Sequence, residues 1–210
     1  MTKPKIIVFS GGCYSGKTTS INVVKSILES RGKHVKCLSE LIRSHNIGSI
    51  DEIRSNPNKY MELQNDIING KIESEKFSYS NFDEDTIILV DRSITDSLFY
   101  LTFYVNKNAL DTEHRELFVN LFHTVNNYLY EVNDIYTYIF EFKPLLNIVE
   151  EDSFRPQNLT EFQPVEYEMI KKYNMLYFNN HNGYLKVDLN DVGLDNMIDF
   201  WTKILDTLNL

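Results

Sequence analysis

Apolar residues along the chain follow two kinds of pattern. Short, nearly continuous apolar runs are typical of strands buried on both faces of a sheet, whereas apolar residues at every third or fourth position are typical of helices. The runs predict strands at Lys5–Ser10, Val35–Ser39, Ile87–Val90, Ile135–Phe140 and Tyr184–Val187. The helical spacing predicts helices at Gly16–Arg31, Lys59–Tyr79, Ile94–Val105, Thr112–Glu131 and Val165–Asn180, and a terminal helix with Leu194, Met197, Ile198, Trp201, Ile204, Leu205 and Leu208 on one face.

The alternation of strands with helices predicts an α/β fold. Successive βαβ units place parallel strands in one sheet and cover both faces of that sheet with helices. With 210 residues, the chain is long enough for a full core and is interpreted as a single domain over residues 1–210. The long loop between the fourth strand and the next helix predicts a lid-like insert at about residues 143–160.

The loop after the first strand matches the pattern G-x-x-x-x-G-K-[ST], which is typical of a phosphate-binding P-loop. Glycines allow consecutive backbone N–H groups to curl around an anion, and the following helix directs its positive end at the same place. Lys17 is expected to contact the β- and γ-phosphates, and the Thr18 hydroxyl to bind Mg²⁺. The predicted ATP-binding residues are Gly11, Gly12, Cys13, Tyr14, Ser15, Gly16, Lys17, Thr18 and Thr19.

Two carboxylates follow the ends of predicted strands, where open α/β sheets bind their ligands. Asp91 follows the third strand and is itself followed by Arg92, whose guanidinium suits the charge of a transferring phosphoryl group. Asp91 could also hold Mg²⁺ or accept a proton. Glu40 follows the second strand, with Arg43 one turn further on. Glu40 and Asp91 therefore both stay candidates for the general base.

The charged loop Glu151–Pro156 lies where a lid would close over ATP. Arg155 within it is expected to complete the positive surroundings of the γ-phosphate. An ordinary exposed loop is the alternative interpretation of the same residues.

The P-loop alone fits GTPases, motor ATPases and kinases, so other residues must discriminate among them. A GTPase would carry Asn-Lys-x-Asp, and the similar run at residues 106–109 lacks the Asp. A hydrolytic ATPase usually follows its strand-end Asp with a Glu that activates water, whereas here Arg92 follows Asp91. This pattern favours a small kinase.

Composition narrows the setting. The formal charge of −9 argues against broad attachment to nucleic-acid phosphates, although lysine and arginine gather at Arg31, Lys33 and Lys36. Cys13 and Cys37 are too few for a disulfide framework, and no apolar run approaches the roughly 20 residues of a membrane span. We therefore expect a cytoplasmic protein, in the host cytoplasm if it is viral, with no membrane partner.

Several of these motifs together resemble one family. The P-loop, Glu40-Leu41-Ile42-Arg43, Gln64, Glu73–Glu75, Asp91–Ser97 and Asp152-Ser153-Phe154-Arg155 are similar to AAA-type P-loop kinases. That family includes the nicotinamide riboside kinase domain of bacterial NAD salvage proteins and bacteriophage kinases that phosphorylate 5-hydroxymethyluridine in DNA. Ser153 stands where family members usually carry Gly.

The resemblance implies a P-loop kinase three-layer sandwich, with a five-stranded parallel sheet in which the Asp91 strand lies beside the P-loop strand. It implies transfer of the γ-phosphate from Mg·ATP to a hydroxyl of a nucleoside-type acceptor. Lys17 would hold the donor with Mg²⁺ at Thr18 and Asp91, and Arg92 and Arg155 would stabilise the transferring group. The acceptor pocket would be formed by Glu40, Arg43, Gln64 and Arg92.

Three functions follow from the sequence. The most specific is a kinase for the base hydroxymethyl of 5-hydroxymethyluridine in phage DNA. The second is a kinase for a free nucleoside, nucleotide or nicotinamide riboside, which the acidic charge suits better. The third is an ATP-hydrolysing switch protein, which Arg92 disfavours. The oligomeric state stays open between monomer and homodimer.

Overall fold

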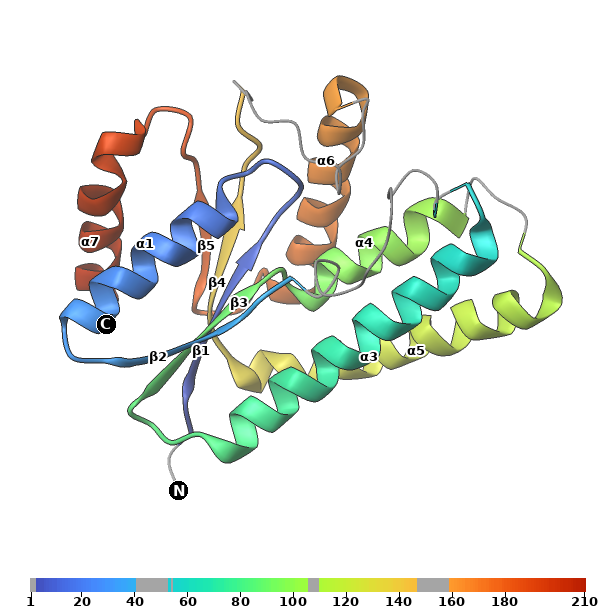
Figure 1. Ribbon diagram of the computed structural model, residues 1–210, viewed down its shortest axis with the longest axis horizontal. Coiled ribbons are helices and arrows are strands. Elements are labelled where there is room, and N and C mark those ends of the chain that lie inside the picture. The colour runs from blue at the N-terminus through green and yellow to red at the C-terminus, as the bar shows by residue number, and fades with distance from the viewer. Residues whose placement is uncertain (1–2, 41–52, 54, 106–109, 147–158) are drawn as a thin grey trace.

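A computed structural model of the chain describes residues 3–40, 53, 55–105, 110–146 and 159–210. One five-stranded sheet runs through the molecule in the order β2-β3-β1-β4-β5, with every neighbouring pair parallel (Figure 1). The strands are β1 (Lys5–Ser10), β2 (His34–Leu38), β3 (Thr86–Asp91), β4 (Tyr136–Phe142) and β5 (Tyr184–Val187). The predicted α/β class, the five parallel strands and the placement of the Asp91 strand beside the P-loop strand are confirmed.

Both faces of the sheet are buried, and β1 shows how its sequence achieves this. Successive side chains of a strand point to opposite faces. Ile6 and Val8 therefore pack into one apolar cluster, while Ile7 and Phe9 pack into another on the opposite face. This is why the central strands read as continuous apolar runs and not as an alternation with polar residues.

Six of the described helices cover the two faces (Figure 1). Helices α1 (Lys17–Ser30) and α7 (Met197–Thr207) lie side by side over one face. The opposite face is covered by α3 (Pro57–Asn81), α4 (Ile94–Val105), α5 (Thr112–Ile135) and α6 (Leu159–Phe178).

Helix α6 begins at Leu159, so the predicted start at Val165 was wrong. Proline lacks an N–H and clashes with the preceding turn, so it is usually found at the start of a helix and not inside one. Pro164 instead lies inside the helix. The turn before it is held by tertiary contacts, because the ring of Phe162 packs against Phe99 and Phe103 at centroid distances of 6.0 and 5.4 Å.

The terminal helix also differs from its prediction. Leu194–Asn196 form a 3-10 turn, and the α-helix starts at Met197. Met197, Trp201 and Leu205 are buried, whereas Ile198 is 61% exposed and was wrongly assigned to the core face. Ile198 lies one position, or about 100°, around the helix from Met197, so it falls off the narrow buried stripe.

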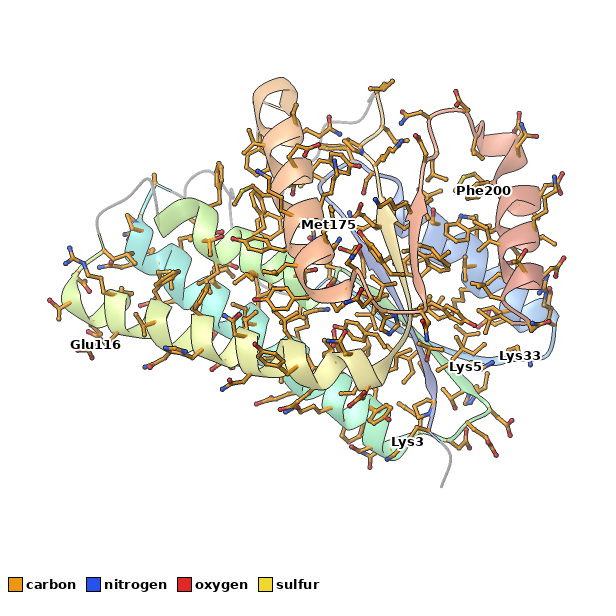
Figure 2. The ribbon with its side chains drawn as sticks, turned by 180° about the vertical axis from the view of Figure 1, so that it is seen from behind. Lys3, Lys5, Lys33, Glu116, Met175 and Phe200 are labelled. Atoms are coloured by element: carbon orange, nitrogen blue, oxygen red, sulfur yellow. The ribbon has the colours of Figure 1, made fainter. Side chains whose placement is uncertain are left out.

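The predicted lid-like insert overlaps residues 147–158, which lie outside the described part of the chain. None of the described helices combines the length and apolar content needed to cross a membrane. Seen from behind, Lys3, Lys5 and Lys33 lie toward the end of the sheet at which the strands begin (Figure 2). The P-loop is at the opposite end, because it follows the carboxyl end of β1 and all strands of the sheet run in the same direction.

Candidate active site

The P-loop joins the carboxyl end of β1 to the start of α1 in a conformation that depends on glycine. Gly16 has φ 82° and caps the amino end of α1, and Gly11 has φ 147°. Residues other than glycine rarely adopt these φ angles. A Cβ on Gly16 would also lie 2.8 Å from Leu189, in the segment after β5. The loop therefore turns tightly and directs the amino end of α1 toward its own centre.

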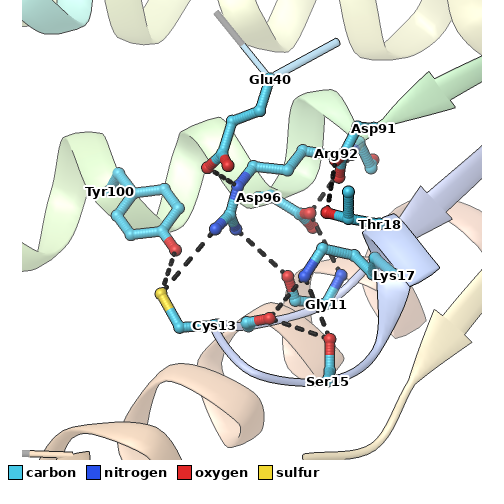
Figure 3. Close-up of polar contacts among 12 residues, drawn as sticks. Gly11, Cys13, Ser15, Lys17, Thr18, Glu40, Asp91, Arg92, Asp96 and Tyr100 are labelled. Carbon is cyan, nitrogen blue, oxygen red and sulfur yellow. Dashed lines mark hydrogen bonds and ion pairs between the residues drawn. The ribbon is translucent and has the colours of Figure 1, made fainter. Parts of the chain in front are cut away.

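Lys17 is buried and turned into the loop (Figure 3). Its ammonium donates to the carbonyl oxygen of Gly12 and to the hydroxyl of Ser15, the latter at 3.0 Å. The Ser15 hydroxyl in turn donates to the Gly12 carbonyl at 2.9 Å. The predicted phosphate-binding lysine is therefore enclosed by the backbone of the loop that it would serve.

Thr18 and Asp91 come together across the sheet edge, although they are 73 residues apart. The Thr18 hydroxyl donates to Asp91 Oδ2 at 3.1 Å. The other oxygen, Asp91 Oδ1, is buried and has no hydrogen-bond partner among the described residues. A buried carboxylate oxygen without a partner is costly unless a ligand satisfies it. Oxygen ligands of these two kinds suit Mg²⁺, so the pair fits the predicted metal site.

Arg92 follows Asp91 with φ 74°, so the chain turns sharply there and carries the guanidinium over the P-loop (Figure 3). Its Nε forms a short ion pair with Glu40, and Nη1 donates to the carbonyl of Gly11 at 3.2 Å. The guanidinium also lies over the ring of Tyr100, 5.0 Å from its centroid. Burial acts to lower the pKa of Arg92, but the facing charge of Glu40 acts to raise it and leaves it well above its usual range.

Asp96 connects the two loops at the site, a role that the sequence analysis missed. Its buried carboxylate accepts from the Ser10 hydroxyl at 2.6 Å, from Gly11 N at 3.1 Å and from Ser93 N at 3.2 Å. Burial raises the pKa of Asp96, against the lowering effect of the nearby Arg92. This one side chain ties the end of β1 to the turn after β3.

Lys71 is a second residue that the sequence interpretation missed. It is buried on α3, where its ammonium donates to the carbonyl of Arg92 at 2.6 Å and pairs with Glu75 at 2.7 Å. The hydroxyls of Tyr128 and Tyr136 donate to the other oxygen of Glu75 at 2.9 and 2.8 Å. The buried Lys71–Glu75 ion pair thus stabilises the left-handed turn at Arg92 through the Arg92 carbonyl.

The structure brings together Lys17, Thr18, Glu40, Asp91 and Arg92 with the P-loop at the carboxyl edge of the sheet. Gln64 is buried on α3, the helix that also carries Lys71. Arg43 and Arg155 lie outside the described residues, so their predicted roles stay predictions. Further polar contacts of the site come from Lys71 on α3, Tyr100 on α4 and Glu166 on α6, none of which the sequence analysis identified.

Solved structures of other proteins share this fold. NadR protein in complex with NR matches with a TM-score of 0.61 and 17% identity, over 99% of this chain and 52% of that one. NadR protein in complex with NAD and AMP-PNP matches with a TM-score of 0.60 and 15% identity, over 99% and 50%. Thymidylate kinase from Candida albicans matches with a TM-score of 0.55 and 14% identity, over 99% and 93%.

The chain spans about half the length of the two NadR chains. At these identities the likeness establishes the fold. No curated protein sequence matches the chain. Residues 6–182, which include the P-loop, the Asp91-Arg92 turn and the first four strands, match the family described as AAA domain, and the chain belongs to that family.

Proposed function

We propose that the chain is an ATP-dependent kinase that transfers the γ-phosphate to a hydroxyl of a nucleoside-type acceptor. The observation that carries the proposal is the position of Arg92. Its guanidinium contacts both the backbone of the P-loop, at Gly11, and the carboxylate of Glu40. A phosphate cradle, a buried cation and a carboxylate therefore converge on one place, as phosphoryl transfer to an alcohol requires.

The donor side of the reaction would be held by the P-loop. Apart from the N–H groups of Gly11 and Cys13, which donate to Asp96 and Glu166, its amides and the amino end of α1 would offer N–H groups to the β- and γ-phosphates. Lys17 would supply a positive charge next to them. Thr18 and Asp91 would hold Mg²⁺, which would neutralise negative charge on the triphosphate. Asp91 Oδ1, which is buried without a hydrogen-bond partner in the described part of the chain, supports this assignment.

The acceptor side would be served by Glu40. Asp91 already accepts from Thr18 on the metal side of the site, so Glu40 is the carboxylate left to take the proton. In the proposed step, the acceptor oxygen bonds to the γ-phosphorus, the bond from that phosphorus to the β-γ bridging oxygen breaks, and the acceptor proton passes to Glu40. Arg92 would stabilise the charge on the transferring group, and ADP leaves.

Two kinds of molecule are candidates for the acceptor of the γ-phosphate. Our specific hypothesis is the base hydroxymethyl of 5-hydroxymethyluridine in phage DNA, following the family resemblance. The alternative is a free nucleoside, nucleotide or nicotinamide riboside. Two features favour the alternative: the charge of −9, and the position of the Arg31 and Lys33 cluster at the end of the sheet opposite the P-loop. Arg31 is moreover bound to Asp206 and to the carbonyl of Leu210.

The test is transfer of labelled γ-phosphate from ATP to a panel of acceptors. The panel holds DNA with 5-hydroxymethyluridine, matched thymine DNA, free deoxynucleosides and their monophosphates, nicotinamide riboside, and no acceptor. Label on modified DNA alone would identify a DNA-base kinase, and label on a small acceptor a nucleoside or nucleotide kinase. Equal release of free phosphate with and without acceptor would contradict the proposal and favour a switch protein.

Lys17→Ala provides the matched control for this assay. Removal of the ammonium takes away the donor-side charge, so we expect transfer to fall by about 10³-fold or more. The variant should keep the unfolding midpoint of the parent within a few degrees. Undiminished transfer by Lys17→Ala would refute the P-loop assignment.

A further inference from the structure

Glu166 on α6 is a fully buried carboxylate that the proposed chemistry does not use. Its Oε2 accepts a hydrogen bond from the backbone N–H of Cys13, in the P-loop, at 2.7 Å. Its Oε1 accepts from the Tyr100 hydroxyl and lies 3.4 Å from the donating Cys13 thiol. A charged side chain in this position is costly to bury unless its contacts matter to the loop.

The contact fixes the orientation of one peptide unit in the P-loop. The carbonyl and the N–H of a trans peptide point in opposite directions. In the Gly12–Cys13 peptide, the carbonyl accepts from Lys17, and the N–H donates to Glu166. Lys17 and Glu166 therefore hold the same peptide from opposite sides. A rotated peptide would set its carbonyl against the carboxylate, and Lys17 would lose its acceptor.

Gly12 is what lets the carboxylate come so close. A Cβ at Gly12 would lie 2.5 Å from Glu166 Oε2 and 2.8 Å from its carboxyl carbon. Unlike Gly11 and Gly16, Gly12 does not have a positive φ. Alanine is therefore disfavoured at this position by the space that Glu166 fills and not by the backbone angle.

Glu166 also reaches the other cation of the site through Tyr100. The Tyr100 hydroxyl donates to Glu166, and the face of the same ring supports the Arg92 guanidinium. The Glu166 carboxylate thus positions both the Tyr100 ring, which contacts Arg92, and the Gly12–Cys13 peptide, which contacts Lys17.

We propose that Glu166 is a positioning residue that locks the Gly12–Cys13 peptide, and with it Lys17, in the orientation that binds the triphosphate. The inference rests on one part of the proposed function, the binding of ATP by the P-loop. It does not depend on phosphate transfer to an acceptor. A carboxylate that competed with phosphate would approach from the Lys17 side of the loop. Glu166 approaches from the opposite side.

The first experiment measures Mg·ATP affinity by calorimetry, without any acceptor. Glu166→Ala removes the carboxylate that accepts from the buried Cys13 N–H, and we expect affinity to fall about tenfold. Glu166→Gln can still accept from that N–H through its amide oxygen, so its affinity should stay within about threefold of the parent. Glu168→Gln is the matched control, since Glu168 is an exposed residue on the same helix that pairs with Lys171 at 3.3 Å.

Thermal unfolding without nucleotide shows whether each variant is folded. Unchanged affinity in folded Glu166→Ala would overturn the proposal. Tighter binding by Glu166→Ala or Glu166→Gln would also overturn it, because the carboxylate would then be a competitor of phosphate.

A double-mutant cycle keeps the inference testable if Glu166→Ala is unstable. Gly12→Ala in the parent should displace the carboxylate and weaken ATP binding by about tenfold or more. The three atoms nearest to the new Cβ all belong to the Glu166 side chain beyond its own Cβ. They are absent in the Glu166→Ala background, so the same change should cost less than about threefold there. Equal losses in the two backgrounds would contradict the coupling. If the parent binds ATP but phosphorylates no acceptor, the proposed kinase function is wrong, whereas the inference about Glu166 is unaffected.

Discussion

The two faces of the sheet are built differently. Under α7 the packing is apolar and aromatic, with the Trp201 ring against Phe9, Phe140 and Phe142 at centroid distances of 5.9, 5.2 and 6.0 Å. The face under α3 to α6 also buries charged and amide side chains, among them Lys71, Glu75, Glu141, Glu166 and Asn174.

The polar residues of the second face lead to the site. Lys71 reaches the carbonyl of Arg92, Asn174 donates to the Ser10 hydroxyl at 2.9 Å, and Glu166 binds Cys13. Burial of polar groups is costly unless they are paired, and the paired groups then rigidify what they touch. The comparison indicates that one face supplies mainly stability and the other sets the geometry of the loops at the carboxyl edge.

The largest expected effect tests the apolar face. Trp201→Ala removes the fully buried indole, and we expect the free energy of unfolding to fall by about 4 kcal/mol. Chemical denaturation measures this loss. The transfer rate of the protein that remains folded should be unchanged within about twofold, because the indole packs against Phe9, Phe140, Phe142 and Phe200, none of which is assigned to the site.

Ile198→Ala is its control on the same helix. Ile198 is 61% exposed, so the loss should stay within about 0.5 kcal/mol. If the transfer rate per folded Trp201→Ala molecule also fell by much more than twofold, the apolar face would not serve stability alone, and the proposed difference between the two faces would be wrong.

The next effect tests the polar face. Lys71→Met leaves the buried Glu75 carboxylate without its cation, so we expect a loss of about 3 kcal/mol in the free energy of unfolding. Because the Arg92 carbonyl also loses its donor, transfer per folded molecule should fall about tenfold. Denaturation and kinetics at saturating ATP measure the two effects separately.

Lys76→Met, five positions along the same helix, removes an exposed lysine that pairs with Glu131 at 2.6 Å. It should change unfolding by less than about 1 kcal/mol and leave transfer unchanged. Normal transfer by Lys71→Met would show that the ion pair serves stability alone.

The smallest effect is a pH dependence at the start of α5. A side-chain hydrogen bond to Asp111 at 2.8 Å raises the pKa of His114 above its ordinary value of 6.5. A raised histidine pKa adds stability below the unfolded-state pKa, and this is lost as the pH rises through the folded-state pKa. The stability difference between the parent and His114→Gln should therefore shrink from pH 5.5 to pH 8.5 in urea titrations. A difference that grows over this range would reverse the assignment.

Local pattern was sufficient for most of the fold and for part of the site. The apolar runs located all five strands, and the P-loop and Asp91-Arg92 were recognised from contiguous residues. The start of α6 was missed because the contacts of Phe162 with α4 outweigh the local penalty of Pro164. Ile198 was misassigned because apolarity alone does not say which side of a helix faces the core.

The site residues that were missed depend on contacts across long stretches of chain. Asp96 accepts from Gly11 across 85 residues, and Glu166 accepts from Cys13 across 153. Nothing in the sequence around Glu166 distinguishes it from Glu168, yet one is buried against the P-loop and the other faces solvent.

By itself the sequence determined what depends on neighbouring residues: the periodicity of each strand and helix, the glycine angles of the P-loop and the carboxylates that follow strand ends. Only the tertiary structure decided which of those groups meet. The pairing of Glu40 with Arg92, the support of Arg92 by Lys71 and the approach of Glu166 to Gly12 arise from the packing of whole helices on the sheet. The physical reason is that backbone angles are set locally, whereas a buried charge is partnered by whichever element the fold brings beside it.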